Sequence, residues 1–236
     1  MDNLNLTIED QEFCCIIGPS GCGKSTLLRI IGGFMETTEG RAEIEGEPIL
    51  GPDIDRGIVF QEYALFPWKN VIQNVEFGLK MKNVPKKERR SIAMQHLKMV
   101  GLEEFSNSAT YNLSGGMKQR VAIARALAND PLVLSMDEPF GALDALTREA
   151  MEIELIKIWK QTHKTIVFIT HDVEEAVFLA SKLVVLTARP GKVNQIFDLS
   201  FSKNFEGDLK ESRKIKTQKD FIDTRTHALN LIWGEL

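Results

Sequence analysis

A glycine-rich octapeptide near the start of the chain constrains its fold more than any other feature. The segment 18–25 reads GPSGCGKS and fits the pattern G-x-x-x-x-G-K-[ST]. An apolar segment (12–17) precedes it and an apolar helical pattern (24–32) follows. A strand, a glycine turn and a helix in this order direct backbone N–H groups and the positive end of the helix at a phosphate. A chance turn would not combine all eight positions with this context, so the sequence predicts a phosphate-binding loop.

The side chains of this loop suggest which atoms touch a nucleotide. Lys24 can reach the β- and γ-phosphates, and the Ser25 hydroxyl can ligate Mg²⁺. Cys22 is a spacer position that either packs inward or faces the rim, and we expect a bulky alkyl group on its thiol to block nucleotide binding. The predicted nucleotide-binding residues of this segment are Gly18, Pro19, Ser20, Gly21, Cys22, Gly23, Lys24, Ser25 and Thr26.

Short apolar segments alternate with helical patterns along most of the chain. Because strands that alternate with helices form parallel sheets, this order predicts an α/β fold. More specifically, we expect a P-loop NTPase core with a mostly parallel sheet and helices on both faces. The expected strands are 12–17, 41–44, 57–60, 132–136, 165–170 and 183–187, and the expected helices are 24–32, 115–128, 145–160 and 173–181.

The segment 71–112 departs from this alternation because it lacks convincing strands. It carries a charged cluster (86–90) followed by an apolar helical stripe (92–100). The cluster is typical of a solvated helix start, and phosphate binding is the alternative. We expect a core over 1–70 and 130–200, an inserted α-helical subdomain over 71–129, and an extension over 201–236 with one terminal helix.

Composition and charge exclude several classes of protein. The 236 residues include 29 Lys and Arg against 33 Asp and Glu, a net charge of −4 that argues against nucleic acid as a partner. No apolar segment approaches the roughly 20 residues of a membrane span, and no secretory segment starts the chain. The three cysteines form no C-x-x-C pair, so neither a zinc site nor a disulfide framework is predicted. We expect a chain that is neither exported nor membrane-spanning.

Two acids close the apolar strand pattern at 132–136. The carboxyl ends of parallel strands are where an α/β sheet exposes its ligand groups. Asp137 can hold Mg²⁺ there, directly or through water, and Glu138 can polarise an attacking water. Taken alone, both acids could be ordinary surface residues, but a neighbouring phosphate loop favours the catalytic interpretation.

Two further polar residues follow expected strands. His171 comes directly after 165–170 and can donate a hydrogen bond to the γ-phosphate; the alternative is a residue beside a helix cap without chemistry, because Asp172 and Glu174 are typical first-turn acids. Gln61 follows 57–60 and can contact Mg²⁺ or the attacking water. The candidate catalytic residues are therefore Glu138, His171 and Gln61, and the candidate metal ligands are Ser25, Gln61 and Asp137.

A second anion-binding helix start is encoded at 113–120, which reads LSGGMKQR. Ser114, Gly115 and Gly116 expose N–H groups and a hydroxyl just before a helix. This segment resembles the signature sequence of ATP-binding-cassette ATPases. The order of the other motifs also matches that family: phosphate loop, Gln61, signature, Asp137-Glu138, GALD at 141–144, then His171.

The resemblance implies how such a chain works with ATP and Mg²⁺. Two cassettes pair head to tail, as a homodimer, and trap two ATP molecules between them. Each ATP lies on the loop of one copy and under Ser114–Gly116 of the other. Asp144 belongs to the segment that couples the two sites.

Finer features narrow the resemblance. The segments 62–68 (EYALFPW), 74–79 (NVEFGL) and 188–193 (ARPGKV) look like those of bacterial importer cassettes for nitrate, sulfonate or taurine. That implies a membrane permease and an extracytoplasmic solute-binding protein as partners, and a peripheral position on the cytoplasmic face of the membrane. Tyr63, Phe66 and Trp68 either form part of a groove that receives a permease helix or pack in the core of the helical subdomain.

The leading hypothesis is an ATPase that powers uptake of a small anion. An alternative is a cassette for nucleic-acid or ribosome work, but such chains usually carry two cassettes or a long coiled-coil insertion. Another is a regulatory nucleotide-binding subunit with little turnover and no coupling to transport. A small-molecule kinase would not need the segment 113–120.

One departure from the family concerns the adenine base. Cassettes of this kind carry an aromatic residue that stacks on adenine well before the phosphate loop. Here Phe13 is the only aromatic residue before Gly18, and it falls in an expected buried strand. We expect weaker ATP binding and base discrimination than in relatives with that platform, because base–aromatic stacking contributes about 1–3 kcal/mol at other nucleotide sites.

Overall fold

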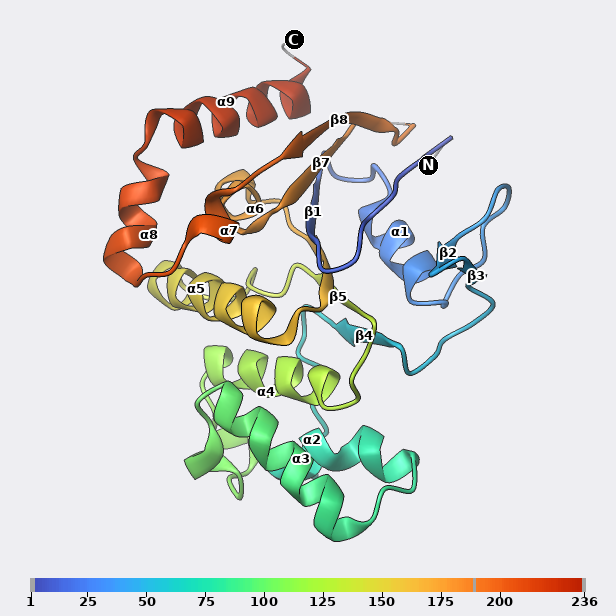
Figure 1. Cartoon of the computed structure of the whole chain (residues 1–236), viewed down its shortest axis with the longest axis vertical. Coiled ribbons are helices and arrows are strands. Elements are labelled where there is room, and N and C mark those ends of the chain that lie inside the picture. The colour runs from blue at the N-terminus through green and yellow to red at the C-terminus, as the bar shows by residue number, and fades with distance from the viewer. Residues whose placement is uncertain (1–2, 189, 235–236) are drawn as a thin grey trace.

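A six-stranded sheet runs through the computed structural model, which describes residues 3–188 and 190–234 (Figure 1). The strand order is β4-β5-β6-β1-β7-β8, and every neighbouring pair is parallel except β7 with β8. The α/β fold with a mostly parallel sheet is therefore confirmed. The strands are β1 (Phe13–Ile17), β4 (Arg56–Val59), β5 (Val133–Asp137), β6 (Thr165–Ile169), β7 (Lys182–Leu186) and β8 (Val193–Asp198).

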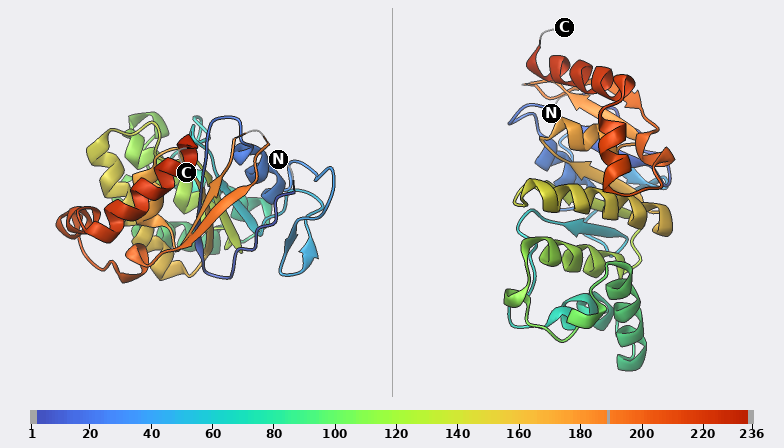
Figure 2. Two further views of the ribbon diagram at one scale, coloured as in Figure 1. Left: turned by 90° about the horizontal axis from the view of Figure 1, so that it is seen from above. Right: turned by 90° about the vertical axis from the view of Figure 1, so that its left-hand side faces the viewer.

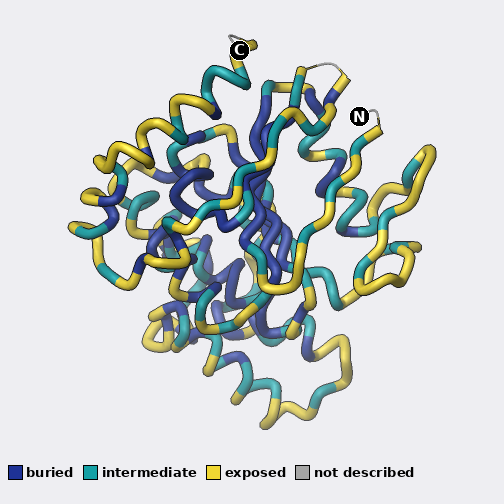
Figure 3. Tube along the Cα trace, turned by 45° about the horizontal axis from the view of Figure 1, so that its top comes forward, coloured by how far each residue is buried: buried dark blue, intermediate teal, exposed yellow. Residues whose placement is uncertain are grey.

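The central strands are mostly apolar because both faces of the sheet are covered. In β1, Cys14 and Ile16 pack with Leu27 and Leu28 of α1 (Lys24–Ile31). Their neighbours Phe13, Cys15 and Ile17 belong to the larger core on the opposite face. That core is covered by α5 (Ala145–Thr162) and α6 (Val173–Leu179), and its buried strands form the dark centre of Figure 3.

Three helices gather at one end of the molecule and form its helical lobe (Figures 1 and 2). They are α2 (Val71–Met81), α3 (Lys86–Met99) and α4 (Gly115–Leu127), with short 3₁₀ turns at Glu103–Phe105 and Thr110–Asn112 between α3 and α4. Asn70 and Gln73 close a capping box at the start of α2. Buried residues such as Ile72 and Leu97 join the lobe to the larger core.

One expected strand is shorter than predicted, and one strand was not expected. The segment 41–44 does not enter the main sheet, because only β2 (Glu43–Ile44) is extended and it pairs with β3 (Glu47–Pro48) in a separate hairpin. The edge strand β8 is unexpected from the sequence. Its residues alternate between half-buried and exposed, and polar side chains interrupt the apolar pattern that marks the central strands.

The terminal helix expected in the extension is present, but two helices that the sequence did not indicate precede it. The extension contains α7 (Phe201–Asn204), α8 (Leu209–Lys216) and α9 (Lys219–Trp233). Helix α8 is almost entirely charged or polar, so its sequence carries little apolar pattern. Tertiary ion pairs hold it instead: Arg213 with Glu149 at 2.8 Å, and Lys216 with the buried Glu152 at 2.7 Å.

Candidate functional site

The phosphate loop connects the buried end of β1 to the start of α1. Gly18, Gly21 and Gly23 have φ values of 158°, 77° and 107°, which residues with a side chain rarely adopt. A Cβ on Gly18 would lie 2.9 Å from the Leu186 carbonyl oxygen. Gly23 caps α1 without a side-chain hydrogen bond, and no acid lies in the first turn. The first N–H groups of α1 therefore have no side-chain partner and suit a bound anion.

The side chains of the loop lie at different depths. Ser20, Gly21 and Ser25 are exposed, Pro19 and Thr26 are half-buried, and Cys22 is only 2% exposed. Cys22 packs beside Cys14 and Leu28, so its side chain lies inward rather than at the rim. The block of nucleotide binding by alkylated Cys22 stays a prediction, and it now requires the loop to open before the reagent reaches the thiol.

Lys24 folds back over its own loop. Its Nζ donates to the carbonyl oxygen of Gly18 at 2.8 Å and to that of Pro19 at 3.3 Å, and it lies 3.9 Å from Cys22 Sγ. An ammonium group has three N–H donors, and the long one to sulfur is the weakest of the three, so a phosphate oxygen would replace it most readily. The lysine thus holds a positive charge at the mouth of the loop.

Asp137 and Ser25 meet across the start of α1. The Ser25 hydroxyl donates a hydrogen bond to the Asp137 carboxylate. Burial, followed by the charge of Glu138, raises the pKa of Asp137 above its usual range. A cation would offset both effects, and a hydroxyl with a carboxylate is the oxygen donor set that Mg²⁺ prefers. The described residues contain no group of three or more His, Cys, Asp or Glu side chains that could hold a metal.

Glu138 lies one residue beyond β5 in a strained backbone conformation. Its φ is 43°, in the left-handed region, and its N–H donates to the Ile169 carbonyl of β6 at 2.8 Å. His171 Nδ1 donates to Glu138 Oε2 at 2.9 Å. Because an ionised carboxylate only accepts, Nδ1 carries the hydrogen in this arrangement. Nε2 is then the ring nitrogen that remains for a further partner.

Gln61 follows β4 and is exposed at the same edge of the sheet. A Cβ on Gly141 would lie 3.6 Å from Gln61 Nε2 and 3.8 Å from Glu138 Oε2, so both side chains face that glycine. The structure therefore brings Gln61, Glu138 and His171 together beside the phosphate loop, at the ends of β4, β5 and β6.

The 113–116 segment lies elsewhere. Ser114 caps α4, and its Oγ accepts the Met117 N–H at 3.3 Å. The nearest neighbours of Gly115 include the Tyr63 hydroxyl and Leu143, whereas Gly116 lies against Thr147. None of the contacts in the described residues joins Ser114, Gly115 or Gly116 to the loop at 18–25 of the same chain.

Asp144 occupies the start of α5, three residues beyond Gly141. It caps the helix by accepting the Thr147 N–H at 3.1 Å and is exposed. Hydrogen bonds from the Thr147 hydroxyl and N–H hold the pKa of this carboxyl below its usual range. The acid is therefore ionised at the surface near the start of α4.

Sequence reasoning missed the residues that hold the loop between Gln61 and Trp68. Asn74 is fully buried in α2, and it accepts the Phe66 N–H at 2.8 Å and donates to the Phe66 carbonyl at 3.2 Å. Arg125 of α4 donates to the carbonyls of Tyr63 and Ala64. Asn74 could have been found from the sequence, because it is a polar residue on the apolar face of a helical pattern. No local sequence pattern marks Arg125.

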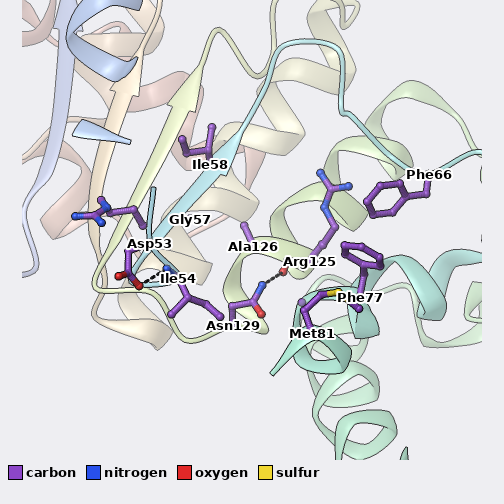
Figure 4. Close-up of a pocket in the computed structure, with 12 residues that line it drawn as sticks. Asp53, Ile54, Gly57, Ile58, Phe66, Phe77, Met81, Arg125, Ala126 and Asn129 are labelled. Atoms are coloured by element: carbon purple, nitrogen blue, oxygen red, sulfur yellow. Dashed lines mark hydrogen bonds between the residues drawn. The ribbon is translucent and has the colours of Figure 1, made fainter. Parts of the chain in front are cut away.

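A groove of about 310 Å³ lies between β4, this loop and the helical lobe (Figure 4). Phe66 packs against Phe77 in a tilted arrangement with 4.5 Å between ring centroids, and both line the groove. Trp68 is 76% exposed, whereas Tyr63 is half-buried. The three aromatic residues therefore do different things: one lines a groove, one is exposed and one packs against α4.

Phe13 cannot supply an adenine platform. It is fully buried, in an edge-on contact with Trp159 at 5.5 Å and a tilted one with Phe168 at 5.9 Å. The expectation of weak base discrimination stays a prediction. Arg189, part of the segment 188–193 compared with importer cassettes, lies outside the described residues. Among the residues that are described, no helix combines the length and the apolar character of a membrane span.

Comparison with known proteins decides the family. A model described as ABC transporter matches residues 1–141. The chain is 50% identical over 236 residues to an uncharacterized ABC transporter ATP-binding protein of Methanocaldococcus jannaschii, covering all of this chain and 85% of that protein. The chain belongs to the ABC transporter family. It is an ATP-binding, ATP-hydrolysing cassette, as the motifs had indicated.

Two further similarities characterise this ABC cassette. It is 48% identical over 235 residues to the taurine import ATP-binding protein TauB of Pelagibacter ubique, covering 99% of this chain and 88% of the relative. A solved dimeric ATP-binding cassette in a post-hydrolysis state, bound to ADP and Pi, is 40% identical with a TM-score of 0.71; the match covers 84% of this chain and 89% of that one. The predicted resemblance to the taurine, sulfonate and nitrate group is thus confirmed at the level of sequence.

Proposed function

We propose that the chain is the ATPase subunit of an importer for taurine or a related small sulfonate, and that it works as a homodimer on the cytoplasmic face of the membrane. The observation that carries the proposal is the convergence of Lys24, Ser25, Asp137, Glu138 and His171 at one edge of the sheet. Among the relatives, proteins named for taurine import support the solute class. Partners are a membrane permease and an extracytoplasmic binding protein, not nucleic acid.

Some residues of the site bind the nucleotide, and others move a proton during hydrolysis. The N–H groups at 18–26 bind the triphosphate of ATP, and Lys24 turns the donor now directed to Cys22 Sγ toward the terminal oxygens. Ser25 and Asp137, assisted by Gln61, would hold Mg²⁺, which neutralises charge on the β- and γ-phosphates when bound. Glu138 takes a proton from water while the water oxygen attacks the γ-phosphorus. The bond to the bridging oxygen breaks, and ADP and phosphate leave.

Glu138 is engaged by His171 in the structure, and this contact has a consequence for the mechanism. To act as a base, the carboxylate needs a free oxygen near the water, and Oε2 is already occupied at 2.9 Å. The other oxygen can serve, with His171 fixing the orientation of the group. His171 thereby positions Glu138 and reaches toward the γ-phosphate with Nε2.

The second copy completes each site. A partner cassette would supply the Ser114–Gly116 helix start to the ATP on Lys24, and the similarity to a solved dimeric cassette supports this pairing. The exposed Leu146 (70%) and Asp144 lie beside the start of α4 and would face that partner. ATP favours the closed pair over the open one, and this difference in binding performs the work.

The groove between β4 and the helical lobe is the proposed contact with the permease. Phe66, Phe77 and Met81 line it, and Trp68 stands exposed at the end of the same loop. An amphipathic permease helix would place apolar residues against these side chains. The helical subdomain at 71–129 then transmits closure of the pair to the membrane, while 1–70 and 130–200 form the ATPase core.

The variant Glu138→Gln tests the proposal. It removes the base but keeps the shape, so we expect phosphate release to fall at least 100-fold. ATP should still drive pairing, measured by light scattering with Mg²⁺. Glu104→Gln, an exposed residue of the helical lobe, is the matched control and should retain wild-type hydrolysis. Undiminished hydrolysis by Glu138→Gln would remove this residue from its role, and a wild-type chain that never releases phosphate with its permease would favour the regulatory alternative.

A further inference from the structure

The loop that carries Gln61 passes through two consecutive strained residues. Tyr63 and Ala64 have φ values of 56° and 48°, both in the left-handed region that favours glycine. A non-glycine pair in this conformation persists only where surrounding contacts fix it. The contacts of the Tyr63 and Ala64 carbonyls therefore decide the shape of this loop.

Arg125 supplies them. Its guanidinium donates from one NH₂ group to the Ala64 carbonyl at 2.6 Å and from the other to the Tyr63 carbonyl at 3.1 Å. The same group lies 5.7 Å from the centroid of the Phe66 ring. In the described residues Arg125 forms no ion pair with an acid, so its donors are directed to the backbone of the loop. Burial lowers the pKa of Arg125, as expected of a cation held inside the fold.

The helix that carries Arg125 begins with the 113–116 segment. Ser114 caps α4 and Arg125 lies near its C-terminal end, three residues before the cap at Ala128. The Tyr63 side chain returns to the start of the helix, since its hydroxyl is 3.1 Å from where a Cβ of Gly115 would lie. The Gln61 loop is therefore attached to both ends of α4. Asn129 further fixes the end of the helix through its bond to the Arg125 carbonyl (Figure 4).

We propose that Arg125 is a positioning residue for ATP hydrolysis: it locks the strained Tyr63–Ala64 backbone and thereby makes the Gln61 loop and the Ser114 helix move as one body. The proposal rests on the proposed function, in which Gln61 serves the ATP on its own chain and Ser114 serves the ATP on the partner. Arg125 lines the permease groove as well, so a displacement there reaches both sites. Without Arg125, the loop relaxes toward ordinary φ values and Gln61 leaves its place.

The test compares four variants of this chain. Arg125→Met keeps a long unbranched side chain but removes all five N–H donors of the guanidinium. We expect kcat to fall at least ten-fold, with ATP affinity changed less than two-fold, since Lys24 and Ser25 belong to a different part of the fold. Arg89→Met is the control, because Arg89 also donates to a backbone carbonyl of the helical lobe, that of Val84 at 3.3 Å, away from Gln61. It should keep the wild-type kcat.

A rescue separates positioning from simple packing. Glycine adopts φ near 50° without strain, so Ala64→Gly lowers the cost that Arg125 otherwise offsets. Added to Arg125→Met, it should restore kcat at least three-fold, although it returns no guanidinium. Lost folding in Arg125→Met would appear in circular dichroism, and the milder Arg125→Lys, which keeps the charge but loses the two-carbonyl fork, then serves instead with a smaller fall in kcat.

Two outcomes would overturn the inference: a wild-type kcat in both Arg125 variants, or an equal fall in Arg89→Met with no rescue by Ala64→Gly. The proposed function fails separately. In that case wild-type and Arg89→Met chains would themselves neither pair with ATP nor hydrolyse it.

Discussion

Three helices of this molecule begin at an aspartate, whereas the two helices that carry the anion-binding motifs, α1 and α4, begin without an acid. Helices α5, α6 and α8 begin at Asp144, Asp172 and Asp208, and each carboxylate accepts backbone N–H groups. Helix α1 begins after Gly23 with no side-chain cap, and α4 begins after Ser114, whose neutral hydroxyl accepts one N–H at 3.3 Å. An acid stabilises a helix start but repels phosphate. The starts of α1 and α4 lack the stabilisation that an acidic cap would give and remain open to an anion.

The largest effect is expected when an acid is placed at the start of α4. Ser114→Asp should cap the helix at least as well, so Tm stays equal or rises, while hydrolysis falls at least ten-fold because the carboxylate meets the γ-phosphate of the partner's ATP. Ser114→Ala is the matched variant. It should lower Tm and reduce hydrolysis less, because it loses the cap without adding charge. The account would be contradicted if the variant with the higher Tm were also the one with the faster hydrolysis.

A pH test sharpens the comparison at α6. Glu175, in the first turn, is buried, and burial raises its pKa to about 8 from 4.5. The folded chain keeps this proton where the unfolded chain has lost it, so stability falls as pH rises from about 5 to 8. Glu152, Asp172 and Arg148 face the group and are unchanged in Glu175→Gln. The loss in Tm between pH 6 and pH 8 should be at least about 2 °C smaller in the variant. Parallel Tm curves for the two proteins would show that Glu175 is already ionised.

The smallest expected effect is at α8, far from the phosphate loop in the sequence. Asp208 accepts the N–H groups of Lys210 and Glu211, which lower the pKa of its carboxyl. Asp208→Ala should lower Tm by about 2–4 °C in thermal melts. Its kcat should equal that of wild type, because this helix start serves only the fold. A fall in kcat at constant stability would assign α8 a role in hydrolysis.

Local sequence patterns predicted the ATP site better than its supports. The phosphate loop, the acids after β5 and His171 each follow an apolar strand, so their order along the chain already indicates one edge of a parallel sheet. The bond between Arg125 and Ala64 spans 61 residues, and no periodic pattern marks either partner. The same holds for Glu152 and Lys216, which are 64 residues apart. Edge strand β8 and helix α8 were missed because polar residues and long-range ion pairs define them.

The central claim, that one cassette covers the ATP of the other, is tested most directly by mixing two inactive chains. Lys24→Ala removes the phosphate contact of its own loop, and Ser114→Asp spoils the helix start offered to the partner. A mixed pair contains one site with an intact Lys24 from one chain and an intact Ser114 from the other. If the site is shared, mixing equal amounts should restore phosphate release to about one quarter of the wild-type rate, because half of the pairs are mixed and one of their two sites is intact. Phosphate release that stays at the level of the separate variants would contradict a shared site.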